Sequence, residues 1–315
     1  MSQPIHVASE YSKSSKSTSG FSLWNVFDRQ FKFWILLPAL IMFVGLTIYP
    51  FLNLLMMAFS TVKFAEGQIV WTFSGLDNFH TFLEDETFMI AVRNTVVFVI
   101  ATVSIELVLG FILALIVSQL TRMASIARAV LMIPILVPAI AIGTLWRLMY
   151  NFEFGIFNRV LTFLNLPIQN WTGDPLLAMP SIIVVDIWHW TAFVFLLMLA
   201  GIESLPIEPI EAARVDGASD WQLLRHIILP LLRPTIIVAL MFRTIFAFKV
   251  FDEVFLLTSG GPGNATEVIS LYINRVFFAQ SRMGYGAFLS LVTIATIAVF
   301  VILYNRLSQA QRRSA

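Results

Sequence analysis

The chain has 315 residues, of which 58% are hydrophobic and only 12% are charged, and it contains no cysteine. An average soluble chain carries about 25% charged residues, and the mean hydropathy here is +0.83, so the composition is that of a membrane protein. The absence of cysteine excludes disulfides and cysteine metal sites. The net charge of +1 says nothing about partners, and we expect no nucleic acid among them.

Residues 1–32 are rich in serine and carry several basic side chains, but they contain no apolar run of the length that a secretory signal needs. We therefore expect this segment to be an uncleaved, disordered tail on the cytoplasmic side.

Six later segments are apolar enough, and about long enough, to cross the roughly 30 Å hydrocarbon layer as helices. They are Phe33 to Ser60, Ala91 to Ser118, Ala127 to Tyr150, Met179 to Glu203, Leu229 to Thr258 and Tyr285 to Leu307. Transmembrane strands would alternate in polarity over short segments, and these segments do not. The sequence therefore predicts an all-α integral membrane protein with about six transmembrane helices.

An even number of spans places both termini on one side of the membrane. If that side is the cytoplasm, the inside segments carry more Lys and Arg than the outside segments, as the positive-inside rule requires. We therefore expect a first span with its outer loop over 33–90, a transmembrane core over 91–307, a cytoplasmic loop at 204–230, and a cytoplasmic tail over 308–315.

The 204–230 loop is too charged to lie in lipid and too rich in helix-forming residues to be an irregular loop. The sequence predicts one short helix ending near Arg214 and stopped by Gly217 in a left-handed conformation. A second helix should start after Ser219, with Gln222 completing a capping box. Such a pair either docks on a partner or lies as amphipathic helices at the membrane interface.

Part of this loop follows the spacing EAA-x3-G-x9-I-x-LP, through Glu211-Ala212-Ala213, Gly217, Ile227 and Leu229-Pro230. It resembles the signature of ABC importer permeases. The resemblance implies a type I importer permease fold and a coupling helix that seats in an ATPase subunit. The residues implied in ATPase coupling are Glu211, Ala212, Ala213, Arg214, Asp216 and Gly217.

A second run, Leu257 to Thr266, reads LT-x-GGP-x3-T and contains Gly260, Gly261 and Pro262. A tight turn that ends a helix would explain this composition alone. The run is also similar to one in the carbohydrate-uptake branch of the importers, which includes maltose- and glycerol-phosphate-type permeases.

That likeness implies several partners: a second, related permease, two ATPase subunits, an extracytoplasmic solute-binding protein and the lipid bilayer. It also implies a multi-pass location in the plasma, or inner, membrane of a bacterium or archaeon. The chain has no G-x-x-x-x-G-K-[ST] phosphate cradle, so we expect no cofactor on it, with ATP and Mg bound by the ATPase subunits.

Ionisable side chains within spans are costly and therefore become functional candidates. Arg243 has no carboxylate within one turn of its own helix, so it either pairs with Glu106 on another span or faces the solute path, where it would suit an anionic solute such as a phosphate- or sulfonate-bearing sugar. For Lys249 we expect local pairing with Asp252 or Glu253.

The family resemblance places the solute path along the fourth and fifth spans, where aromatic side chains suit stacking on a sugar ring and would look the same as plain packing residues. The matching residues are Trp188, His189, Trp190, Phe193, Arg243, Phe246, Ala247 and Val250. An ion-coupled secondary transporter is the alternative, with Glu106 and Asp186 as coupling groups. No catalytic motif favours a membrane enzyme.

Overall fold

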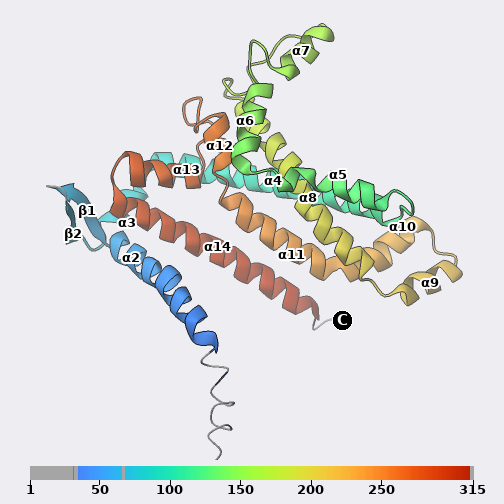
Figure 1. Ribbon diagram of the computed structural model, residues 1–315. Coiled ribbons are helices and arrows are strands. Elements are labelled where there is room, and N and C mark those ends of the chain that lie inside the picture. The colour runs from blue at the N-terminus through green and yellow to red at the C-terminus, as the bar shows by residue number, and fades with distance from the viewer. Residues whose placement is uncertain (1–30, 32–34, 66–67, 313–315) are drawn as a thin grey trace, which may run out of the picture. The chain divides into compact units, whose positions relative to one another are not determined.

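The computed structural model describes residue 31 and residues 35–65 and 68–312, and the predicted tail over 1–32 lies outside them except for Phe31. Nearly all of the described residues are helical, so the predicted all-α class is confirmed (Figure 1). The labelled α-helices are α2 (Tyr49–Ala58), which ends the first span, α3 (Asp77–Leu83), α4 (Glu86–Ser118), α5 (Ala124–Leu136), α6 (Ala139–Met149), α7 (Ile156–Phe163), α8 (Ala178–Glu203), α9 (Ile207–Val215), α10 (Asp220–Leu223), α11 (Leu229–Phe248), α12 (Asp252–Leu257), α13 (Ile269–Asn274) and α14 (Met283–Arg312).

Five helices of the described chain are long and apolar enough to cross a membrane, and a bent pair makes a sixth candidate span. The five cover Ile35–Ala58, Glu86–Ser118, Ala178–Glu203, Asp220–Phe248 and Met283–Tyr304. The predicted count of about six is confirmed when the bent pair is taken as one span. The first span belongs, as far as Asn53, to a unit separate from the rest of the chain.

The bent pair consists of α5 and α6, whose axes meet at 91°. Val137 has ψ 127°, an extended conformation, and Pro138 follows it directly before α6. A residue that precedes proline is pushed out of the helical region by the proline ring, so the helix stops there and restarts in a new direction. The sequence predicted one continuous helix from Ala127 to Tyr150, and this was wrong in that respect.

The fifth span differs from its predicted bounds at both ends. It begins at Asp220, because α10 continues through a π-helical turn (Leu224–Ile228) into α11 without a break. It ends at Phe248, where the chain leaves the helix before α12 starts at Asp252. The hydroxyl of Ser270 donates to the Val250 carbonyl, which satisfies one backbone group that the break sets free.

The first outer loop holds the two described strands. Strands β1 (Ser60–Ala65) and β2 (Gln68–Phe73) form an antiparallel hairpin, in which Ser60 lies opposite Phe73. The side-chain amide of Asn78, on α3, donates to the Ala58 carbonyl at 2.8 Å. This bond ties α3 to the end of the first span.

The core lies where α4 and α8 pack together, with α5 and α11 against them (Figure 1). Gly110 allows the close approach of α4 to α8, because a Cβ there would lie 2.7 Å from Cγ1 of Val194. In Figure 1, α9 and α10 lie at one end of α11, and α12 lies at the other end. The structure therefore keeps the two loops singled out by sequence at opposite ends of one helix.

Candidate functional site

The 204–230 loop forms a helical hairpin, as predicted. Helix α9 ends at Val215, and Gly217 follows with φ +78°, the left-handed conformation that glycine accepts without strain. Ser219 and Gln222 complete the predicted capping box at the start of α10. The sequence predicted α10 as a separate short helix, and this was wrong, because α10 forms the first turn of the fifth span. The loop is therefore coupled rigidly to α11.

The hairpin exposes the side chains proposed for ATPase coupling. Glu211, Ala212, Arg214, Asp216 and Gly217 are exposed and Ala213 is half-buried. The exposed set is continued by two large apolar residues that the sequence analysis did not single out: Val215 is 88% exposed and Trp221 is 66% exposed. In the sequence, these two residues could have been recognised as large apolar side chains among the charged residues of the loop. Exposed apolar residues surrounded by polar ones suit a protein-binding surface.

The predicted solute-path residues do not form one surface. Trp190 stacks on Phe246 with ring centroids 5.2 Å apart, and Phe193 meets Phe246 edge-on at 6.0 Å. Phe242, one turn before Phe246, joins this cluster from α11, packing edge-on against Phe193. All four rings are partly exposed, so they offer an aromatic face on which a sugar ring could stack.

Trp188 lies on another side of α8. It packs edge-on against Trp146 of α6 at 5.8 Å and lines a hollow of 560 Å³ beside Pro134. Side chains two positions apart on a helix point in nearly opposite directions, so Trp188 and Trp190 cannot share one surface. The structure therefore separates the residue pair that the sequence grouped together.

Arg243 is 1% exposed and is bound to two carboxylates. Its Nη2 donates to Glu106 Oε1 at 2.8 Å and to Asp186 Oδ2 at 2.5 Å, and its Nε donates to Glu106 Oε2. The guanidinium carbon lies 5.0 Å from the centroid of the Trp190 ring. Of the two alternatives for Arg243, the structure has the ion pair with Glu106, and it adds Asp186.

The remaining path candidates lie in the interior of the bundle. His189, Ala247 and Val250 are all buried. The Nδ1 atom of His189 lies 3.2 Å from Oε1 of Glu253. The predicted local pairing of Lys249 was wrong, because α11 ends at Phe248, Lys249 is exposed, and Glu253 faces His189 from a different helix.

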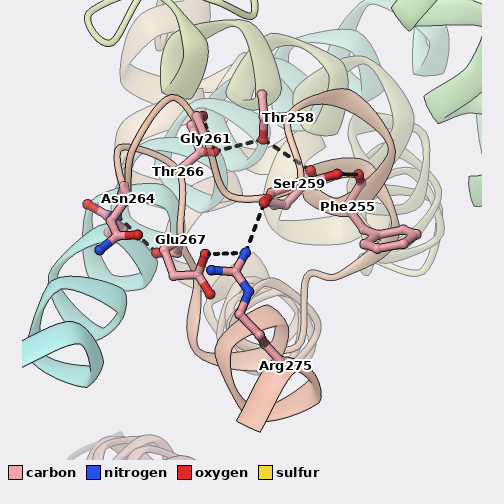
Figure 2. A network of polar contacts seen from close by, with 10 residues as sticks. Phe255, Thr258, Ser259, Gly261, Asn264, Thr266, Glu267 and Arg275 are labelled. Carbon is pink, nitrogen blue, oxygen red and sulfur yellow. Dashed lines mark hydrogen bonds and ion pairs between the residues drawn. The ribbon is translucent and has the colours of Figure 1, made fainter. Parts of the chain in front are cut away.

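The outer turn after α12 is held by a polar network (Figure 2). The Thr266 hydroxyl donates to the Gly261 carbonyl at 2.7 Å, and Arg275 Nη2 donates to the Ser259 carbonyl at 3.0 Å. From α4, the amide of Asn94 donates to the carbonyls of Asn264 and Glu267 at 2.9 Å each. The turn with Gly260, Gly261 and Pro262 is therefore fixed to the helix bundle.

Glu267 is the buried centre of this network. Its Oε2 forms an ion pair with Arg275 Nη2 at 3.1 Å, and neither carboxylate oxygen accepts a hydrogen bond from the described residues. Burial raises the pKa of Glu267 above its ordinary value, and the charge of Arg275 opposes this shift. Among the described residues, no group of three or more His, Asp or Glu side chains is arranged to hold a metal ion.

Comparison with known proteins identifies the chain's relatives. Residues 106–313 match the family model described as binding-protein-dependent transport system inner membrane component. The trehalose/maltose transport system permease protein of Thermococcus litoralis is 39% identical over 240 residues, 76% of this chain and 81% of the relative. The sulfoquinovosyl glycerol transport system permease protein of Agrobacterium fabrum is 32% identical over 280 residues, 89% of this chain and 91% of the relative.

Solved structures agree with the sequence relatives. A chain of a bacterial alginate ABC transporter, solved in complex with its alginate pentasaccharide-bound periplasmic protein, superposes with a TM-score of 0.79 at 25% identity. The superposition covers 91% of this chain and 97% of that one. The alternative of an ion-coupled secondary transporter gains no support from these relatives.

Proposed function

Because this chain belongs to the family of binding-protein-dependent transport system inner membrane components, we propose that it is the permease subunit of an ATP-driven importer for a sugar or sugar derivative. It works by alternating access in the plasma membrane of a bacterium or archaeon. Two relatives named for sugar transport, at 39% and 32% identity, support the solute class.

The exposed α9–Gly217–α10 hairpin carries this proposal. Its second helix, α10, continues into α11 without a break, and α9 packs against α10, so a force applied to Ala212 or Val215 is passed through this contact to α11, which carries part of the aromatic cluster. ATP and Mg are bound by two ATPase subunits, and this hairpin docks on the ATPase subunits. A second, related permease and an extracytoplasmic solute-binding protein complete the complex.

The aromatic cluster supports a sugar ring as the transported group. Trp190, Phe193 and Phe246 present partly exposed ring faces, and the C–H face of a sugar is apolar. Arg243 is committed to Glu106 and Asp186, so in this conformation it has no free donor fork for an anion. We propose that ring stacking, more than charge, holds the solute on this chain. An anionic sugar would then be recognised by the solute-binding protein or the second permease.

The test is ATP hydrolysis by the complex reconstituted from this chain and the permease, ATPase and solute-binding protein encoded beside it. We expect the binding protein loaded with its sugar to stimulate hydrolysis in wild type. Ala212→Asp should reduce that stimulation by about tenfold or more, because a charge on the docking face costs at least about 1.4 kcal/mol. Thr162→Asp, on the exposed side of α7, is the control.

A complex in which Ala212→Asp retains full stimulation would remove the coupling role of the hairpin. Failure of every sugar, neutral or anionic, to stimulate hydrolysis in wild type would remove the sugar proposal.

A further inference from the structure

Five ionisable side chains meet inside the bundle between α4, α8, α11 and α12. They are Glu106, Asp186, His189, Arg243 and Glu253, and each is at most 5% exposed. We call them the buried charge cluster. Neither the solute stacking nor the ATPase docking described above makes use of it.

The contacts form a chain from one helix to the next. Glu106 on α4 and Asp186 on α8 both accept hydrogen bonds from Arg243 on α11. One turn along α8, His189 contacts Glu253 on α12. Residues three apart lie on the same face of a helix, so α8 presents Asp186 and His189 together.

This arrangement bridges the break in the fifth span. Arg243 lies before the break at Phe248, and Glu253 lies after it. Helix α8 is thus tied to the chain on both sides of the break, through Asp186 and through His189. The buried charge cluster therefore acts as a clamp that sets the position of α12 relative to α11.

The charges of the cluster do not balance when every carboxyl group is ionised. Three carboxylates face one guanidinium, which leaves two negative charges if His189 is neutral and one if it is cationic. An uncompensated charge in a low-dielectric interior is strongly unfavourable. Nearby, Lys249 is exposed and Asp252 is half-buried, and neither forms an ion pair with another described residue.

We infer that the buried charge cluster binds a proton: at least one carboxyl group, of the Glu106 and Asp186 pair that shares Arg243, is held in the neutral form. The neutral carboxyl group keeps an acceptor for the guanidinium while removing one negative charge. His189 and Glu253 complete the clamp on α12. The cluster is a proton-holding clamp across the broken span.

Infrared spectroscopy of the purified complex at neutral pH tests the proton directly and needs no transport. Outside the buried charge cluster, Glu267 is the one buried carboxyl group among the described residues, so the spectra are taken in a Glu267→Gln background. We expect the carbonyl stretch of a protonated carboxyl group, shifted in D2O, and its loss in Glu106→Gln or Asp186→Asn. Glu203→Gln, which removes an exposed carboxyl group, should leave the band unchanged.

Thermal unfolding of the same complex provides the second measurement. If one of the pair is neutral, its amide variant mimics the native state and should unfold within about 2 °C of wild type. Arg243→Met should unfold much earlier, because it leaves buried carboxylates without a cation. The inference is overturned if the band is absent in the Glu267→Gln background, if it survives both amide variants, or if both amide variants are as unstable as Arg243→Met.

Discussion

At the residue scale, the outer turn explains why its motif contains glycine at position 260. Gly260 has φ +86°, and a Cβ there would lie 2.1 Å from Oε2 of Glu267. Glycine is required at this position for two reasons: the backbone has a positive φ, and the buried carboxylate occupies the space that a Cβ would fill. Figure 2 shows the Glu267 carboxylate beside this turn, where it meets Arg275.

This geometry predicts different outcomes for two neighbouring glycines. Gly263 also has a positive φ, +59°, but no atom lies within 4 Å of its added Cβ. Gly263→Ala should therefore cost only the backbone strain, about 1 kcal/mol. Gly260→Ala should cost about 1–3 kcal/mol more, because it also displaces Glu267. Thermal unfolding of the two variant complexes measures the difference, and equal losses would mean that the carboxylate moves aside freely.

Glu267 also predicts a dependence of stability on pH. The pKa of Glu267 is raised in the folded protein, so its carboxyl group binds a proton more tightly in the folded protein than in the unfolded chain. The stabilisation is complete below the ordinary glutamate pKa and is lost as pH rises through the raised pKa. Glu267→Gln cannot ionise, and we expect it to remove this loss and to raise the unfolding temperature at neutral pH by about 2 °C.

The measurement is thermal unfolding of the purified complex over a pH series, with Glu84→Gln as a control at an exposed carboxyl group. If Glu267→Gln lowers the unfolding temperature at neutral pH, the ion pair with Arg275 outweighs the cost of burial.

At the element scale, the contact of α4 with α8 sets the geometry that the buried charge cluster needs. Gly110 lies one turn from Glu106, and its missing side chain lets Val194 approach. In the same way, Gly143 admits Leu256 where α6 packs on α12, since a Cβ there would lie 2.5 Å from a Leu256 methyl carbon. Close helix contacts at small residues are typical of membrane bundles.

Gly110→Ala should therefore force α4 and α8 apart and cost about 1–3 kcal/mol. Adding Val194→Ala removes Cγ1 of Val194, the nearest of the three atoms that the new methyl group meets, while the Val194 Cβ and the Phe195 backbone nitrogen remain, so the double variant should recover part of the loss. Gly45→Ala, which meets no atom within 4 Å, is the control. The unfolding temperatures of the four complexes provide the test, and the absence of any recovery in the double variant would contradict the proposed contact.

At the scale of the whole molecule, we expect the two loops singled out by sequence to lie on opposite sides of the membrane, because they lie at opposite ends of α11. The chain has no cysteine, so single cysteines report accessibility without background. Asp220→Cys, at the start of α10, should react with an impermeant thiol reagent only after the cells are opened. Asn264→Cys, in the outer turn, should react in intact cells. Both positions are exposed. The reverse pattern would invert the orientation predicted from Lys and Arg.

The sequence by itself determined the elements whose signals are local. Apolar runs located the spans, Gly217 and the Ser219–Gln222 capping box located the helical hairpin, and its spacing predicted the family that the comparisons then identified. These features depend on residues a few positions apart. For that reason composition and spacing are sufficient to find them.

Only the tertiary structure decided how distant residues combine. The break after Phe248 redirected Glu253 from Lys249 to His189, and the contact of three helices gave Arg243 two carboxylates where the sequence offered one. Packing likewise decided which neighbour each ring meets, since Trp188 contacts Trp146 of α6 and Trp190 contacts Phe246 of α11. Partners 57 and 137 residues apart in the chain are selected by packing, and no local pattern encodes that selection.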